Sequence, residues 1–304
     1  MTALSEQAPA KINLGLTLGP PREDGRHLLV TVMQPVTLMD RVRLLPAALG
    51  TGTDEVVCAG VQGENLALAA LAAFRARTGW RGAPVRLEID KRIPVAAGMA
   101  GGSADAGAAL RLAARAAGVR DDELLREIAA GLGADVPAQV RPRRYLATGA
   151  GEELRALPDA APFGVLVVRS ERELATADVF READRLGLPR ARAQLEAREA
   201  ELVAALAAGA ALPPAELLLN DLEPAAVSLV PELAWTLDDV RGTGASQAHV
   251  CGSGPTVIGL YPDLERARAA AVMLSGRRPA PIAAEPWYRG LSGGERPSGP
   301  GRGA

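Results

Sequence analysis

The stretch Pro94-Val-Ala-Ala-Gly-Met-Ala-Gly-Gly-Ser-Ala-Asp105 decides how this chain is organised. The segment before it, Val85-Arg-Leu-Glu-Ile-Asp90, alternates apolar and polar side chains, as a half-buried strand does. After it, small apolar residues recur at helical spacing, so we expect a helix to begin between Ser103 and Asp105, with Ser103 suited to its N-cap. A loop between a strand and a helix N-terminus presents free N–H groups and the positive end of a dipole, which favour an anion.

The loop differs from the two familiar nucleotide-binding loops. The chain contains no Gly-Lys-Ser or Gly-Lys-Thr, and the spacing Gly-x-Gly-x-x-Gly is missing. Gly98, Gly101 and Gly102 still allow a ligand to approach the backbone without meeting a Cβ atom. A simple strand-to-helix turn remains an alternative, but a phosphate-binding loop of another type is the favoured interpretation.

Length and composition indicate a globular chain of two domains. Of its 304 residues, 48% are hydrophobic and 23% charged, and the net charge of −2 gives no electrostatic footprint for nucleic acid. The sequence shows neither an apolar run long enough to cross a bilayer nor a signal-peptide pattern. The two cysteines, Cys58 and Cys251, form neither a disulfide framework nor a metal cluster. We therefore expect a cytoplasmic protein without a nucleic-acid or membrane partner.

Lysine is rare in this chain. Of 34 basic residues only Lys11 and Lys91 are lysines, and the rest are arginines. A position that keeps lysine against this bias is expected to need a compact ammonium rather than a planar guanidinium.

The remaining pattern alternates strands and helices. Strands are expected over 8–16, 28–38, 40–45, 145–157 and 163–168, and on both sides of a Gly-Ser-Gly turn within 248–261. Helices are expected over 65–77, 121–130, 177–186, 191–208 and 264–274, and in a segment ending near Leu237; residues 51–63 are interpreted as an irregular glycine-rich segment. A linker at 157–162 divides the chain into domains 1–157 and 158–288, and 289–304 is expected to be a disordered tail.

Four polar residues stand out at candidate functional positions. Lys11 and Asn13 share one face of the first strand, although an edge strand with a solvated lysine would look the same. His27 lies where a loop enters a strand, as a ligand contact or a surface histidine would. Asp135 lies between glycines and a proline, in a turn that either directs its carboxylate into a cleft or uses it for a local Asx-turn.

Several of these motifs, taken in order, resemble the superfamily of small-molecule kinases named for galactose, homoserine, mevalonate and phosphomevalonate, the GHMP kinases. The motifs that carry this resemblance are Pro9-Ala-Lys-Ile-Asn-Leu14, the glycine-rich loop ending at Asp105, and Cys251-Gly-Ser-Gly-Pro-Thr256. Within the superfamily, the chain is most similar to the family of 4-diphosphocytidyl-2-C-methyl-D-erythritol kinases. The narrower resemblance rests on Ala10-Lys-Ile-Asn-Leu14, Asp24-Gly-Arg-His27, Asp90-Lys-Arg-Ile-Pro94, Gly133-Ala-Asp-Val-Pro137 and Asn220-Asp-Leu-Glu223.

The resemblance, which spans about residues 8 to 285, implies a fold and an activity. The fold is a two-domain α+β architecture. Its N-terminal α/β domain resembles domain 2 of ribosomal protein S5 and carries the loop, and its C-terminal α+β domain is ferredoxin-like. The activity is ATP-dependent phosphorylation of the 2-hydroxyl of 4-diphosphocytidyl-2-C-methyl-D-erythritol, in the non-mevalonate route to isoprenoid precursors. ATP and Mg²⁺ are the implied cofactors, and a monomer or homodimer is expected.

The resemblance also assigns roles to residues. Lys11 and Asp135 correspond to the catalytic pair. The ATP phosphates are assigned to Pro94, Val95, Ala96, Ala97, Gly98, Met99, Ala100, Gly101, Gly102, Ser103 and Ala104. The substrate with its cytidine diphosphate group is assigned to Asn13 at the acceptor, to Arg26 and His27 at the cytosine, and to Thr176 and Phe180 around the cytidine. No dedicated metal ligand is apparent, which is acceptable because magnesium often relies on nucleotide oxygens and water.

The assigned chemistry is physically sensible. Phosphoryl transfer depends on positioning and charge neutralisation more than on covalent help. An aspartate within hydrogen-bond reach of the acceptor alcohol can take its proton, and a neighbouring ammonium offsets the charge that develops. This requirement would explain why Lys11 is not arginine.

The chain departs from the family pattern near the substrate. Arg26 stands where the family usually has a tyrosine that packs on the cytosine, although a guanidinium can also stack on a base. Met33 replaces a common aromatic residue, and Ala138-Gln139 replace the usual phenylalanines. Two alternatives therefore stay open: a GHMP kinase for homoserine or a mevalonate-like alcohol, and a non-catalytic nucleotide-binding sensor on the same fold.

Overall fold

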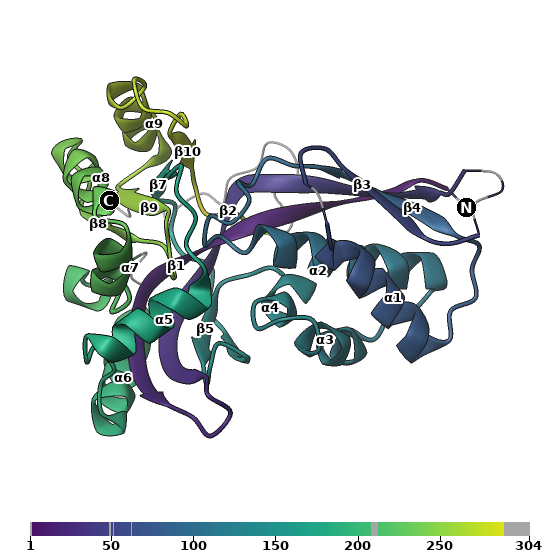
Figure 1. Ribbon diagram of the computed structural model, residues 1–304, viewed down its shortest axis with the longest axis horizontal. Helices are drawn as coiled ribbons and strands as arrows, with labels where there is room; N and C mark the ends of the chain where they lie inside the picture. Colours follow the sequence, from purple (N-terminus) through teal and green to yellow (C-terminus); the bar gives the residue numbers. More distant parts are fainter. Residues whose placement is uncertain (1, 49, 51, 62, 208–211, 289–304) are drawn as a thin grey trace, which may run out of the picture.

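Two long antiparallel strands run through both halves of the molecule (Figure 1). The computed structural model describes residues 2–48, 50, 52–61, 63–207 and 212–288. Strand β1 spans Leu4–Pro21 and pairs with β2, His27–Pro46. From Ala8 to Leu18 every residue of β1 is buried, because helices or strands cover both of its faces.

The N-terminal half is a sheet covered on one side by helices. Its strand order is β3-β4-β2-β5-β6, with β1 beside β2, and all pairs are antiparallel except β3 with β4. The remaining strands are β3 Glu55–Cys58, β4 Val85–Asp90, β5 Tyr145–Thr148 and β6 Glu153–Ala156. The covering helices are α1 Leu66–Thr78, α2 Gly101–Ala117, α3 Asp122–Ala130 and α4 Val136–Val140 (Figure 1).

The C-terminal half is built on a second, four-stranded antiparallel sheet. Its order is β10-β7-β9-β8, formed by β7 Gly164–Val168, β8 Gln247–Val250, β9 Val257–Tyr261 and β10 Ile282–Ala284. Its helices are α5 Thr176–Arg185, α6 Arg192–Ala207, the 3-10 turn Ala215–Leu217, α7 Glu223–Leu229, α8 Glu232–Gly242 and α9 Leu264–Met273. The two sheets with their helices give the two-domain α+β architecture that the resemblance implied. The domain limits at 157 and 158 stay a prediction.

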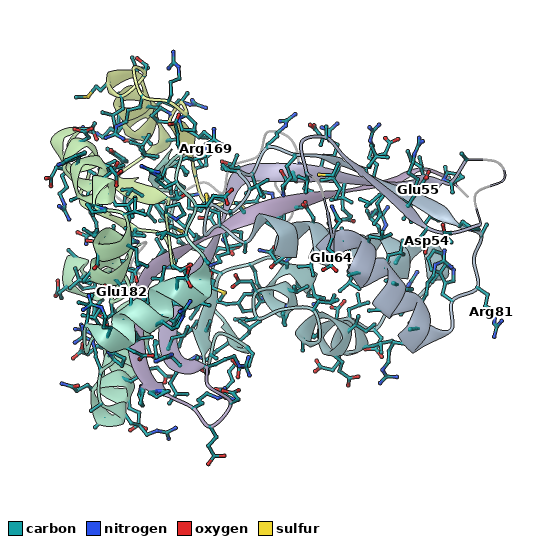
Figure 2. All side chains as sticks on the ribbon, viewed as in Figure 1. Asp54, Glu55, Glu64, Arg81, Arg169 and Glu182 are labelled. Atoms are coloured by element: carbon teal, nitrogen blue, oxygen red, sulfur yellow. The ribbon has the colours of Figure 1, made fainter. Side chains whose placement is uncertain are left out.

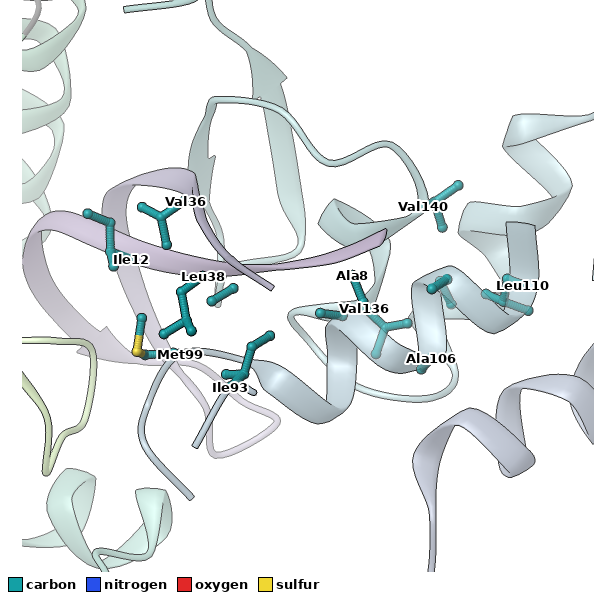
Figure 3. Close-up of a cluster of buried hydrophobic side chains, with 14 of the residues drawn as sticks. Ala8, Ile12, Val36, Leu38, Ile93, Met99, Ala106, Leu110, Val136 and Val140 are labelled. Atoms are coloured by element: carbon teal, nitrogen blue, oxygen red, sulfur yellow. The ribbon is translucent and has the colours of Figure 1, made fainter. Parts of the chain in front are cut away.

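The glycine-rich loop is anchored in the largest apolar cluster. Figure 3 shows Ile93 and Met99 of the loop segment beside Ile12, Val36 and Leu38 of the two long strands. The same cluster continues along α2 and α4 through Ala106, Leu110, Val136 and Val140. The backbone N–H of Lys11 also donates to the carbonyl oxygen of Met99 at 3.1 Å. The buried side of the loop is therefore held against β1.

Helices with clear end signals match the sequence prediction well. The side chain of Asn65 caps α1 through the N–H of Ala67, and Gly79 ends that helix in the left-handed conformation. The side chain of Asp121 caps α3 through two backbone N–H groups. These helices lie within a residue or two of their predicted ranges, because cap residues mark helix ends in the sequence.

Several predicted boundaries were wrong. Helix α2 begins at Gly101, after Ala100 in the left-handed conformation, so Ser103 lies inside the helix and is not its N-cap. The strands expected over 28–38 and 40–45 are the single strand β2, in which the buried charge of Asp40 had interrupted the apolar pattern. The segment 145–157 is a hairpin, β5 and β6, rather than one strand.

Other elements were missed because they are short or irregular in sequence. Strand β3 has four residues inside the glycine-rich segment 51–63, and helix α4 has five residues. The helical segment expected to end near Leu237 is two helices, α7 and α8, with Pro231 between them. The predicted disordered tail, 289–304, lies outside the described residues.

The crossing of α2 and α4 generates a test of stability. A Cβ atom on Gly107 would stand 2.5 Å from the backbone oxygen of Gln139, too close for any side chain. Gly107→Ala is expected to lower the free energy of unfolding by about 1–3 kcal/mol, although alanine is the better helix former. Gly102→Ala, in the same helix but facing open space, is the matched control and should leave the melting temperature unchanged or higher. Equal melting temperatures for the two variants would contradict this packing account.

Candidate active site

Buried charge in this molecule is concentrated around the glycine-rich loop. Most charged side chains lie at the surface of the molecule, as Arg81 illustrates (Figure 2). Lys11, Asp40 and Asp105 are among the few that are buried, with exposed fractions of 8%, 0% and 4%. Burying an ion is costly unless it is paired, so these residues must be held by specific partners.

The loop backbone is strained and touches the late Cys251–Thr256 turn. Ala96 and Ala100 have φ angles of 54° and 55°, in the left-handed region that costs a residue with a Cβ atom about 1–2 kcal/mol. Gly98, at φ 69°, lies so close to this turn that a Cβ atom would be 2.7 Å from the oxygen of Cys251 and 2.8 Å from that of Gly254. Such strain is characteristic of ligand-binding loops.

A buried asparagine holds the late turn from behind. The side-chain amide of Asn220 donates to the carbonyl oxygens of Val250 and Gly252 at 2.6 and 2.7 Å, and its Oδ1 accepts the N–H of Leu222. The turn that faces the loop is therefore fixed by the motif that precedes α7.

His249 fixes the backbone at Asn13. Burial lowers the pKa of His249 and so favours the neutral ring. Its Nε2 lies 3.0 Å from the carbonyl oxygen of Asn13, an acceptor, so Nε2 carries the proton and donates. The second half of the chain thereby helps to position β1.

Lys11 lies at the centre of the site. Its Nζ donates to Asn13 Oδ1 at 2.8 Å and to the backbone oxygen of Gly98 at 3.5 Å, and it lies 3.7 Å from Asp135 Oδ2. The amide of Asn13 in turn donates to Thr31 Oγ1 at 3.0 Å. The ammonium therefore joins β1, the loop and the start of α4. The alternative of a solvated lysine on an edge strand is excluded.

Asp135 presents its carboxylate to Lys11 and to the open cleft. It occupies the N-cap position of α4, but its side chain makes no cap hydrogen bond, so the carboxylate is not used by the local backbone. The side chain is 33% exposed, against 10% for Lys11. An ammonium and a partly solvated carboxylate next to a glycine-rich loop at a helix N-terminus are suited to proton and phosphoryl transfer.

A cleft of about 490 Å³ lies over this pair. It is lined by most of the predicted residues, namely Lys11, Asn13, Pro94, Val95, Ala96, Ala97, Gly98, Ala100, Gly101, Gly102, Asp135, Thr176 and Phe180. Met99 and Ala104 are buried and, like Ser103, are not among the lining residues, so their assignment to the ATP phosphates stays a prediction.

Two predicted substrate residues, Arg26 and His27, are not in the lining of the cleft. The Nε2 of His27 lies 2.7 Å from Asp184 Oδ1, and its ring centroid is 5.4 Å from that of Phe180. Arg26 is exposed and pairs with Asp24 through both its Nε and its terminal nitrogen. His27 therefore reaches the cleft through Phe180, whereas the Arg26 side chain is held by its own turn.

Sequence reasoning left other lining residues without a site role. Thr31 and Ser253 contact Asn13 and Thr176 respectively, and Asn65 was interpreted only as a helix start. Lys91 and Asp105 also line the cleft, and the signals that pointed to Lys91 were the bias against lysine and its place in the motif Asp90-Lys-Arg-Ile-Pro94.

Within the described part of the chain, no group of three or more His, Cys, Asp or Glu side chains could hold a metal ion. The same residues contain no helix long and apolar enough to cross a membrane.

Comparison with known proteins gives two family matches along the chain. Residues 65–142 match the family described as GHMP kinases N terminal domain, and residues 194–278 match GHMP kinases C terminal. A Streptomyces coelicolor protein named 4-diphosphocytidyl-2-C-methyl-D-erythritol kinase is 43% identical over 282 residues, covering 90% of this chain and 92% of its own. A Nocardioides protein of the same name is 42% identical, covering 89% and 92%.

Solved structures show the same similarity in three dimensions. A crystal structure of 4-(cytidine 5'-diphospho)-2C-methyl-D-erythritol kinase matches with a TM-score of 0.76 and 32% identity, over 93% of this chain and 98% of that one. A homoserine kinase from Cytophaga hutchinsonii matches with a TM-score of 0.67 over 94% and 95% of the two chains. At 18% identity, that second match shows the fold alone.

The two structural asparagines of this region generate a stability prediction. Asn220→Ala leaves two buried carbonyl oxygens without their donor and is expected to cost about 2–4 kcal/mol of unfolding free energy. Asn65→Ala removes only the α1 cap and should cost about 1 kcal/mol. Urea denaturation of both variants measures the difference. Equal losses of unfolding free energy in the two variants would show that Asn220 does not hold the late turn.

Proposed function

This chain belongs to the GHMP kinases and, within them, to the family of 4-diphosphocytidyl-2-C-methyl-D-erythritol kinases, and we propose that Lys11 and Asp135 carry out its phosphoryl transfer. The reaction moves the γ-phosphoryl group of ATP to the 2-hydroxyl of 4-diphosphocytidyl-2-C-methyl-D-erythritol and gives the 2-phosphate and ADP. It is a step of the non-mevalonate route to isoprenoid precursors.

The observation that carries the residue assignment is the contact between Lys11 and Asp135 beside the loop. Their side chains lie 3.7 Å apart in one cleft, although they come from β1 and from the turn before α4. Asp135 accepts the proton of the acceptor hydroxyl as the bond to phosphorus forms. Lys11 places its charge between that carboxylate and the transferred group, and offsets the negative charge of the transition state.

The loop supplies the binding of the ATP phosphates. The first N–H groups of a helix have no intrahelical partner, and those of α2 begin at Gly101, in the lining of the cleft. Together with the helix dipole they favour a polyphosphate. Asn13, held by Thr31 and by the backbone contact to His249, is proposed to line the acceptor site beside Lys11.

Magnesium is proposed to enter with ATP. Mg²⁺ keeps several waters and uses one or two carboxylates with the phosphate oxygens of a nucleotide, so it needs no protein cage. The lining of the cleft fits this mode, because it includes the carboxylate of Glu64 besides that of Asp135, so a carboxylate would be available to magnesium while Asp135 takes the proton. Bound magnesium would neutralise charge on the phosphates.

The cytidine end of the substrate is assigned to the α5 side of the cleft. Phe180 presents an aromatic ring that a base can stack on, and Thr176 lies 3.0 Å from the hydroxyl of Ser253. His27 remains the proposed hydrogen-bonding partner of the cytosine, and Arg26 a proposed stacking partner at the rim. A location in the cytoplasm and a monomeric or homodimeric state are proposed on the same family resemblance.

No observation favours either alternative, a GHMP kinase for homoserine or a mevalonate-like alcohol, or a non-catalytic nucleotide-binding sensor. The homoserine and mevalonate kinases match at 18% and 14% identity, which supports a common fold and no particular acceptor. A non-catalytic sensor has no need of the paired Lys11 and Asp135. An ADP-release assay with the cytidyl substrate, homoserine and mevalonate tests the choice: faster turnover of either of the last two would overturn it.

Replacing either member of the pair is expected to abolish most turnover. Asp135→Asn and Lys11→Met should each lower kcat by about 10²- to 10⁴-fold, since each removes a group that acts in the transition state. The affinity for ADP, measured by calorimetry, should change by less than about tenfold, because the loop amides remain. Near-normal turnover in Asp135→Asn would refute its role as the base.

The aromatic contact to cytidine has its own test. Phe180→Ala should raise KM for the cytidyl substrate by about 5- to 100-fold, the effect of losing one base–aromatic stack, while KM for ATP stays unchanged. Trp235→Ala is the matched control, because Trp235 is an exposed aromatic residue of α8 outside the cleft lining. If both variants kept the wild-type KM, the cytidine would lie elsewhere.

A further inference from the structure

Lys91 is the second of the two lysines, and the proposed catalytic pair does not use it. It follows β4 directly and lines the cleft together with Gly101 and Asp105. Because the other 32 of the 34 basic residues are arginines, a lysine retained here indicates that a compact ammonium is required.

The ammonium of Lys91 lies between two buried carboxylates. Its Nζ is 2.5 Å from Asp40 Oδ2 and 2.7 Å from Asp105 Oδ2. The side chains of Lys91, Asp40 and Asp105 are 12%, 0% and 6% exposed. Asp40 belongs to β2 and Asp105 to α2, so this triad joins the sheet to the helix that carries the loop.

The triad holds both ends of the glycine-rich loop. On one side, Asp40 Oδ1 accepts the backbone N–H groups of Arg92 and Ile93 at 2.5 and 2.8 Å, immediately before the loop begins at Pro94. On the other side, Lys91 Nζ lies 3.1 Å from the point that a Cβ atom on Gly101 would occupy. The ammonium therefore stands against the first residue of α2.

Stability alone does not account for this arrangement. Replacing a buried ion cluster with apolar residues is often neutral or stabilising, so such a cluster is weak support for a stabilising role. Burial raises the pKa of Asp105 even though Lys91 opposes the shift, and the nearby charge of Asp40 adds to the rise. Asp105 Oδ1 has no hydrogen-bond partner among the described residues. The arrangement is better explained by its effect on the position of the glycine-rich loop.

We propose that Asp40, Lys91 and Asp105 form a positioning triad that fixes the distance between Ile93 and Gly101, the two ends of the loop. The affinity for nucleotide therefore depends on Lys91, whereas the rate of the phosphoryl-transfer step does not. The inference rests on the proposed function in one respect, that the loop binds the ATP phosphates. Lys91 acts through the loop backbone and is a positioning residue. A guanidinium is longer and planar, so arginine cannot occupy the same space without displacing Asp40, Asp105 or Gly101.

Calorimetry with ADP and magnesium tests the proposal on Lys91→Arg and Lys91→Met. Both variants are expected to bind ADP about 10- to 100-fold more weakly, with a parallel rise in KM for ATP, because the loop amides are displaced. At saturating ATP, kcat should fall by less than about threefold, and KM for the cytidyl substrate should not change. A purely structural role would lower the melting temperature without this split between KM and kcat.

Arg92→Met is the matched control. Arg92 is the adjacent basic residue, but its side chain is 64% exposed, pairs only with Asp90 among the described residues, at 3.5 Å, and does not line the cleft. The ADP affinity of the Arg92→Met variant should equal that of the wild type. Circular dichroism shows which variants fold. If Lys91→Met does not fold, the double variant Lys91→Met/Asp105→Asn is used in its place, because it leaves only one buried carboxylate, that of Asp40.

Two outcomes would overturn the proposal. One is wild-type ADP affinity in folded Lys91 variants, and the other is a loss confined to kcat. The binding measurement also separates this proposal from the proposed function. If the wild type bound ADP but phosphorylated no cytidyl substrate, the proposed function would be wrong. The ADP affinity of the Lys91 variants relative to the wild type would still decide the role of Lys91.

Discussion

The close contact between Gly98 and the late glycine turn is the constraint on which the rest of the site depends. A Cβ atom at position 98 would collide with two carbonyl oxygens of that turn, so the loop and the turn fit only because the residue is glycine. The contact brings the N-terminal loop against the C-terminal half, in which Asn220 fixes the late turn and His249 contacts the backbone of Asn13 in β1. It thereby forms the cleft in which Lys11 meets Asp135.

The chemistry of this cleft depends on placing charges rather than on reactive groups. The thiol of Cys251, near Lys11, is fully buried, and burial raises its pKa, so it remains a neutral packing residue. Lys11 is held by Asn13 and the backbone of Gly98, and the free end of Asp135 faces solvent. Preorganised charge of this kind is what phosphoryl transfer requires, because it costs no reorganisation in the transition state.

Sequence reasoning worked where local chemistry decides the structure. Helices α1 and α3, which Asn65 and Asp121 cap, lie within a residue or two of their predicted ranges, and the strand–loop–helix order around Gly98 was correct. It failed where tertiary contacts override the local pattern. Asp40 is buried inside β2 because Lys91 and two backbone N–H groups satisfy it, and nothing near Asp40 in the sequence reveals those partners.

The same division holds for the site. Lys11 and Asp135 were matched through family motifs, since their spacing in the sequence carries no information about their contact. The ring contact of His27 with Phe180 and the pairing of Arg26 with Asp24 depend on how loops fold, and only the structure gives them. The rarity of lysine was the one compositional signal that pointed to both Lys11 and Lys91, but only Lys11 was assigned a role at the site.

A crystal structure with a non-hydrolysable ATP analogue and the cytidyl substrate is the most direct measurement of the central claim. It should place the 2-hydroxyl within about 3.2 Å of the Asp135 carboxylate, with Lys11 Nζ between that carboxylate and the γ-phosphate. The phosphates should lie on the amides between Pro94 and Gly102. An acceptor hydroxyl out of hydrogen-bond reach of Asp135, or phosphates away from the loop, would contradict it.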